Sequence, residues 1–196
     1  MSLVSRYPTR RYSNRLYRHF AGFSEAGATS RAHSRFVSEF QKTFDMSQWR
    51  SIWAVTLTLK QALHHDDGSR EFLDLHECEK NFRQFMRRLN GAVFRNAASR
   101  YWKRLRVIPV HEKGRDTRFH THAALEGPER LTDDAFAKLI RTSWGATPWA
   151  DRLTDIQPNA DQGWGNYLLK LRGKSGLEHW PDCIDWGSFH NPTADA

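Results

Sequence analysis

The chain is poor in cysteine and has no long hydrophobic run. Cys78 and Cys183 are the only cysteines among 196 residues, which is too few for a disulfide framework or a four-cysteine zinc site and predicts a reducing environment. No segment approaches the roughly 20 apolar residues of a membrane-spanning helix, and the N-terminus lacks the apolar core of a signal peptide. We therefore expect a cytoplasmic protein with no membrane partner.

The composition that remains is basic and rich in aromatic residues. Lys and Arg number 30 against 22 Asp and Glu, for a net charge of +8, and nucleic acid is the default partner of such a chain. Residues 1–50 hold nine basic and three acidic residues, and the segment from Arg83 to Arg106 holds eight basic residues and no acid. The excess charge therefore lies in an N-terminal arm and in one internal segment.

The sequence divides into three parts. Residues 1–47 form a basic arm that alternates arginine with tyrosine, and phenylalanines four apart predict a short helix from about Ser30 to Phe44. The arm either binds along a nucleic-acid strand or is simply exposed to solvent, and the pattern alone does not decide between these two possibilities. Residues 48–178 form the main domain, and residues 179–196 are expected to be a loosely ordered tail.

Within the main domain, strands and helices alternate. The pattern predicts strands at 52–59, 107–110, 118–125 and 151–156, and helices at 76–98, from Thr132 onward and from about Asp161 to Gly173. This order indicates an α+β fold, in which a central antiparallel sheet of about five strands is flanked by helices. The arrangement is similar to a ferredoxin-like or RNA-recognition-motif sandwich.

A histidine pair lies in the third expected strand. His120 and His122 are two residues apart, so both side chains project from one face, where they can share a metal ion. A turn that pairs Glu112 with Arg118 makes Glu112 a diagonal neighbour of His120 and completes a two-histidine, one-carboxylate site. A slip of one residue would turn Glu112 to the other face. The alternative is a structural histidine pair beside a solvated acid.

A tyrosine and a lysine share one side of the last expected helix. Tyr167 and Lys170 are three residues apart and therefore neighbours on the helix surface. A tyrosine beside an ammonium group can act as a nucleophile toward a phosphate. The alternative is a core aromatic in line with Trp164, with Lys170 at its rim.

Taken in order, these features resemble the HUH endonuclease superfamily, and within it the single-tyrosine, Rep-type initiators of rolling-circle replication. The family has a hydrophobic, threonine-bearing strand, a His-hydrophobic-His strand with an acidic partner, and a tyrosine followed three residues later by lysine. The matching positions are Val55-Thr56-Leu57-Thr58-Leu59, then His120 and His122 with Glu112, then Tyr167 with Lys170. The chain departs from the pattern at Thr121, which occupies the hydrophobic position between the histidines.

The resemblance implies an enzyme that nicks and joins single-stranded DNA at specific sites to initiate replication. Glu112, His120 and His122 would hold Mn²⁺ or Mg²⁺ at the scissile phosphate. Tyr167 would attack phosphorus to give a 5′-phosphotyrosine and a free 3′-hydroxyl, with Lys170 stabilising the charge. The DNA partner would be a single-stranded or hairpin origin. Because the chain has no Gly-x-x-x-x-Gly-Lys-Ser/Thr loop, a host or separately encoded helicase would unwind it and a polymerase would extend it.

The internal basic segment supplies candidate phosphate contacts, although a solvated helix face is an equally good explanation for any one of them. They are Arg83, Arg87, Arg88, Arg95, Arg100, Lys103 and Arg104. Four tryptophans could stack on bases, but a core position is favoured for each; these are Trp102, Trp144, Trp149 and Trp164.

Three other functions are compatible with the sequence. A single-tyrosine transposase of the same superfamily would use the same residues on a different DNA. A metal-dependent hydrolase that uses water would make Tyr167 dispensable. A non-catalytic nucleic-acid-binding module would explain the charge and leave the metal ligands as coincidence.

Overall fold

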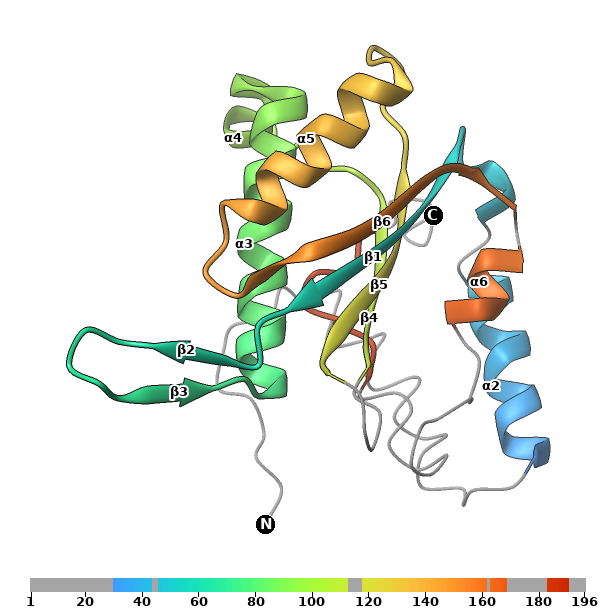
Figure 1. Cartoon of the computed structure of the whole chain (residues 1–196). Coiled ribbons are helices and arrows are strands. Elements are labelled where there is room, and N and C mark those ends of the chain that lie inside the picture. Colours follow the sequence, from blue (N-terminus) through green and yellow to red (C-terminus); the bar gives the residue numbers. More distant parts are fainter. Residues whose placement is uncertain (1–29, 44–45, 113–117, 162, 169–182, 191–196) are drawn as a thin grey trace.

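A four-stranded antiparallel sheet forms the centre of the computed structural model (Figure 1). The structure describes residues 30–43, 46–112, 118–161, 163–168 and 183–190. The sheet has the order β4-β5-β1-β6, and its strands are β1 (Ile52–Leu59), β4 (Val107–Glu112), β5 (His120–Glu126) and β6 (Ala150–Ala160). The α+β class and the antiparallel sheet are thereby confirmed, with four strands in the sheet of the described chain.

The order of the elements explains this arrangement of strands. Helix α3 (Leu75–Phe94) connects β1 to the far edge strand β4, and α5 (Asp133–Gly145) connects β5 to β6. The resulting β-α-β-β-α-β sequence is that of a ferredoxin-like fold. A short hairpin of β2 (Ala62–His64) and β3 (Arg70–Phe72) projects from the end of β1, in a part of the chain where the pattern predicted no strand.

The larger core lies between one face of the sheet and helices α3 and α5 (Figure 1). Every second residue of β1 points into it, because successive side chains of a strand point to opposite faces of the sheet. Its fully buried members come from β1, α3 and α5, and include Trp53, Val55, Leu57, Phe82, Phe85, Phe136 and Ile140. These three elements form one packed unit.

A smaller core covers part of the opposite face. The alternate residues Ile108, Val110 and Ala124 pack there against Leu168 of α6 (Gly163–Leu168) and against Trp186 near the C-terminus. The β4–β5 hairpin also presents three polar side chains on this face, and they form the site described below. The sheet thus separates these polar side chains from α3 and α5.

The predicted helices are confirmed where the structure describes them, with one interruption; of the last one it describes α6 (Gly163–Leu168), and residues 169–173 lie outside the described ranges. Helix α2 (Ser30–Thr43) matches the helix expected in the arm, and Thr132 caps α5 by accepting a hydrogen bond from the backbone N–H of Ala135 at 3.3 Å. The helix expected over 76–98 breaks at Arg95, whose φ of 49° is not helical, and continues as α4 (Asn96–Arg100). None of the helices in the described ranges is long and apolar enough to span a membrane.

The prediction of a loosely ordered tail was wrong for residues 183–190. Val107 of β4 exchanges backbone hydrogen bonds with His190, and the N–H of Asp185 donates to the carbonyl of Pro109 at 3.1 Å. An edge strand leaves backbone groups unpaired, and this segment pairs some of them. Pro109 has no N–H to offer, so it contributes only its carbonyl.

Candidate functional site

The β4–β5 register brings Glu112 closer to the histidines than the sequence predicted. Glu112 pairs directly with His120, and Val110 pairs with His122, whereas the assumed turn paired Glu112 with Arg118. The predicted pairing was wrong because the connecting loop is two residues longer than assumed. A shift of two residues keeps every side chain on its original face, so the prediction that the three side chains share a face is confirmed.

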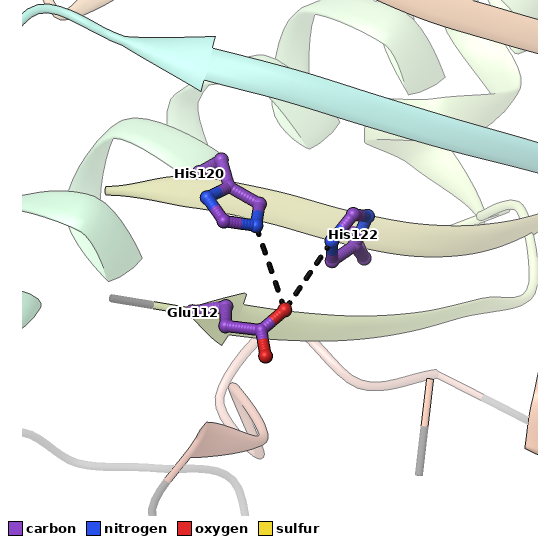
Figure 2. A group of neighbouring side chains, drawn as sticks. All are labelled: Glu112, His120 and His122. Carbon is purple, nitrogen blue, oxygen red and sulfur yellow. Dashed lines mark ion pairs between the residues drawn. The ribbon is translucent and has the colours of Figure 1, made fainter. Parts of the chain in front are cut away.

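Glu112, His120 and His122 form a compact cluster (Figure 2). One carboxylate oxygen of Glu112 lies 3.5 Å from His120 Nε2 and 3.3 Å from His122 Nε2. All three groups can place a ligand atom within 4.8 Å of the others. The two imidazoles meet edge to face, with ring centroids 4.7 Å apart, and both direct Nε2 toward the same oxygen of Glu112.

The remaining ring nitrogens have partners that orient the histidines. His120 Nδ1 lies 3.0 Å from the carbonyl oxygen of Arg118, and because a carbonyl only accepts, Nδ1 must carry the proton. In a neutral ring Nε2 then holds a lone pair directed at Glu112. His122 Nδ1 lies 2.9 Å from the hydroxyl of Thr56 on β1, and a hydroxyl can accept from the same tautomer. This is the orientation that metal-binding histidines adopt.

The donor set fits a metal ion. Two imidazole lone pairs and a carboxylate facing one another repel unless a cation, either a proton or a metal, lies between them. Two nitrogens and an oxygen suit first-row divalent ions such as Mn²⁺ or Zn²⁺. Glu112 and His120 are partly buried, and His122 is buried. An ion held by the three side chains could therefore still reach a substrate from the side of Glu112 and His120. The cluster can therefore hold a metal ion.

Tyr167 lies beside this cluster. Its ring is edge-on to His122 at 5.5 Å between centroids and stacks on Trp164 at 4.8 Å, nearly parallel at 12°. Trp164 Nε1 donates a hydrogen bond to the carbonyl of Ala123 at 3.2 Å, which holds α6 over β5. Tyr167 remains 45% exposed, so its phenol is accessible to a large substrate. Lys170 lies outside the described residues.

Two supporting residues were not assigned a role from the sequence. Thr56 was noted only as part of a strand motif, yet it pairs with His122 across β1 and β5. Trp164 was favoured as a core residue, yet it is only partly buried and carries Tyr167. Spacing places Trp164 in line with Tyr167, since residues three apart share a helix face, but it does not predict that the two rings stack. Thr56 could not be found without the strand register.

The threonine between the two histidines also has a structural reason. Thr121 points to the opposite face from His120 and His122 and is completely buried. Its hydroxyl lies 2.8 Å from Nδ1 of the buried His111. A hydrophobic residue at this position would leave that imidazole nitrogen without its partner.

The seven basic residues predicted to bind DNA are not brought to the metal cluster. They lie on α3, at the break between α3 and α4, on α4 and in the segment after α4. Helix α3 packs on the face of the sheet opposite the cluster, and α4 follows it on that side (Figure 1). Arg83 is partly buried and pairs with Glu79 at 3.5 Å, and the other six are exposed. Among the tryptophans, Trp144 and Trp149 are core residues as favoured, but Trp102 is 60% exposed.

The geometry combines a three-ligand metal cluster with an accessible phenol on the same face of the sheet. Metal ligands beside a tyrosine can serve phosphoryl chemistry. Neither the models of protein families, nor the curated proteins, nor the solved structures contain a match to this chain.

Proposed function

We propose that the protein is a metal-dependent enzyme that nicks and rejoins single-stranded DNA, with Tyr167 as the nucleophile. One observation supports this most directly, namely that the ring of Tyr167 contacts His122, whose Nε2 faces Glu112 together with that of His120. The resemblance to single-tyrosine HUH initiators, in which these residue types occur in this order, supports the same reaction and the start of rolling-circle replication as its role. The proposed setting is the cytoplasm, with a separately encoded helicase and polymerase.

The proposed reaction exchanges one phosphodiester for another. The phenol oxygen of Tyr167 loses its proton and bonds to phosphorus, and the bond from phosphorus to the 3′-oxygen breaks. The 3′-oxygen takes up a proton, which leaves a free 3′-hydroxyl and a 5′-phosphotyrosine. Because the number of phosphoester bonds is unchanged, a returning 3′-hydroxyl can reverse the reaction without ATP.

Different side chains of this protein are proposed to bind the metal ion, to orient its ligands and the phenol, and to stabilise charge. Glu112, His120 and His122 would hold the divalent ion, Mn²⁺ or Mg²⁺, which when bound withdraws charge from the phosphate oxygens. Thr56 fixes the ring of His122, and Trp164 holds the phenol plane of Tyr167 beside it. Lys170 is proposed to stabilise the phenolate or phosphate charge.

The test is a covalent-adduct assay on labelled DNA. We would incubate the protein with Mn²⁺ and a 5′-radiolabelled and a 3′-radiolabelled single-stranded library of random sequence, then run denaturing gels. A protein band that carries only the 3′-label, and a tryptic peptide with a nucleotide on Tyr167 by mass spectrometry, are expected. Tyr167→Phe should lose the adduct, while Tyr101→Phe, which changes an exposed tyrosine of α4's C-terminal end, should keep it.

Other outcomes select the other functions. Metal-dependent cleavage that persists in Tyr167→Phe without an adduct would identify a hydrolase that uses water. Metal-independent binding without cleavage of any sequence would identify a nucleic-acid-binding module. An adduct that forms only on transposon-end hairpins would identify the transposase.

A further inference from the structure

A cavity opens beside the β4 edge of the sheet, on the side that α3 covers. Its volume is about 660 Å³, within the range of sites that hold small molecules or segments of larger ones. Four parts of the chain form its wall, namely α3 from Arg83 onward with Arg95 after it, α4, the segment 102–107 and the C-terminal segment 187–190. The metal cluster lies on the opposite face of the sheet, so the cavity is a separate site.

The cavity divides the basic residues of the internal segment into two groups. Five of the seven line it and two do not, and no aspartate or glutamate is among its lining residues. The five are Arg83, Arg87, Arg95, Lys103 and Arg104, and the two outside are Arg88 and Arg100. A hollow surrounded by one sign of charge concentrates the field and attracts an anion.

Two of these arginines have no acidic partner among the residues that the structure describes. Arg83 is paired with Glu79, but in the part of the chain that the structure describes no carboxylate lies within 4.0 Å of Arg87 or Arg95. Both are exposed. Arginine presents a fork of donors that matches a phosphate group, so these two side chains are available for phosphates of a ligand.

The cavity also offers a flat ring and an apolar floor. Trp102 lines it with 60% of its surface exposed, and the floor is formed by the buried residues Met86, Leu105 and Val107. Asn90 Oδ1 accepts the backbone N–H of Leu105 at 2.8 Å and fixes the segment that carries Trp102 to α3. An exposed indole among arginines is the combination that binds stacked bases and their phosphates.

The backbone around the cavity is held in uncommon conformations. Arg95 and Trp102 have φ angles of 49° and 55°, and they are two of the three non-glycine residues with positive φ in the described chain. Such conformations cost energy and tend to occur where a side chain must be held in place for function. Here they direct two residue types that recognise nucleic acid into the same cavity.

We propose that this cavity binds a second segment of single-stranded DNA, apart from the segment cleaved at Tyr167. Arg87 and Arg95 contact its phosphates, and one base stacks on Trp102. The choice of DNA as the ligand rests on the function proposed above. Because the sheet separates the cavity from the metal cluster, the bound segment anchors the DNA and does not take part in the chemistry.

The test compares two double variants that remove equal charge. Arg87→Ala/Arg95→Ala removes cavity residues, and Arg88→Ala/Arg100→Ala removes exposed arginines of α3 and α4 outside the cavity. Affinity for a fluorescein-labelled 30-nucleotide single strand is measured by anisotropy from 50 to 300 mM KCl without metal. The cavity variant should bind at least tenfold more weakly, and its salt slope should fall by about 1.4, since each contact on a single strand contributes roughly 0.7. The control should lose less than threefold.

The stacking contact is tested separately. Trp102→Ala should weaken binding roughly tenfold without changing the salt slope, and Trp102→Phe should recover most of the loss, because a phenyl ring still stacks. Equal losses in both double variants, or no loss in either, would overturn the proposal. So would displacement of the strand by micromolar dAMP, which would indicate a mononucleotide site.

Failure of this proposal and failure of the proposed function give different results. Cavity-dependent binding without any Tyr167 adduct would leave the anchor site in place and refute the nicking function. A Tyr167 adduct, together with DNA binding that the cavity substitutions do not weaken, would support the nicking function and refute the anchor site. Circular dichroism of each variant controls for loss of folding.

Discussion

The two faces of the β4–β5 hairpin use histidine in opposite ways. On the face toward α3, the side chain of His111 is 1% exposed, with Nδ1 beside the Thr121 hydroxyl and Nε2 3.6 Å from Asp185 Oδ2. That separation is an ion-pair distance rather than a hydrogen bond. His111 therefore joins β4 to β5 and to the C-terminal segment, and it cannot reach a substrate.

On the opposite face, His120 and His122 are more accessible and direct their Nε2 atoms to one oxygen of Glu112. Their other nitrogens are occupied by Arg118, which precedes β5, and by Thr56 on β1. The comparison shows that residue type and strand do not separate a structural histidine from a candidate ligand. What separates the two kinds of histidine is the burial of the side chain and the direction of its free lone pair.

The largest expected difference between the two faces comes from removing a candidate metal ligand. His120→Ala should reduce Mn²⁺-dependent nicking by more than 100-fold, because only two ligands remain, and should change the free energy of unfolding by less than about 1 kcal/mol, because the site is partly exposed. Nicking assays, Mn²⁺ electron paramagnetic resonance and urea unfolding measure these effects. The matched control is His64→Ala, which removes an exposed histidine of β2. A large stability loss with metal binding intact would make His120 a structural residue.

Removing the partner of His111 should give the reverse result. Asp185→Ala leaves a buried imidazole without its charged neighbour, and the free energy of unfolding should fall by about 3 kcal/mol. Mn²⁺ affinity should stay within threefold of the wild type, because Asp185 is on the other side of the hairpin. Urea unfolding at constant m-value and metal titration test this. Loss of metal binding with unchanged stability would show that the two faces are not independent.

A smaller effect is expected from the residue that orients His122. Thr56→Val preserves the shape of the side chain and removes the oxygen beside Nδ1, so Mn²⁺ affinity should fall roughly 10–100-fold. Thr58→Val is the control, since Thr58 lies on the same face of β1 but donates to the carbonyl of Leu153 at 2.6 Å. Equal affinities in both variants would remove Thr56 from the site.

The smallest effect concerns pH and the buried side of the hairpin. Burial alone would raise the pKa of Asp185, but the adjacent His111, Ser188 and Arg83 outweigh burial and lower the pKa. An acid with a lowered pKa in the folded state stabilises fully above its unfolded pKa and loses that contribution as the pH falls through its folded pKa. Stability of the wild type should therefore decline below about pH 4, the ordinary range of an aspartate. Asp185→Asn should flatten this part of the profile in thermal unfolding, whereas Asp67→Asn, which changes an exposed loop aspartate, should change it less.

Much of the fold could be predicted because the hydrophobic pattern of each element is local. The class, the helix in the arm, the cap at Thr132 and the shared face of the three ligands all depend on periods of two or 3.6 residues. The prediction that the three ligands share a face is confirmed although the predicted register was wrong, because the register differed by two residues and not by one. The length of a loop between strands, in contrast, leaves no such periodic pattern.

Features that depend on contacts between distant segments could not be predicted. No proline or glycine stands at position 95 to mark the break in the helix. Trp102 is 60% exposed, although a core position is favoured for a tryptophan from sequence alone. The pairing of residues 183–190 with β4 involves single bridges, Val107 with His190 and Val110 with Ile184, too few to form an alternating pattern. Such contacts are settled by tertiary packing.

The C-terminal segment on β4 has a consequence for solubility. β4 is an edge strand with five consecutive buried residues, and an uncovered edge of this kind is a template for association with another chain. Pro109 and the two bridges leave few backbone groups available for such pairing. Deletion of residues 183–190 should therefore cause aggregation during expression and storage before it reduces any activity of the metal cluster on the opposite face of the sheet.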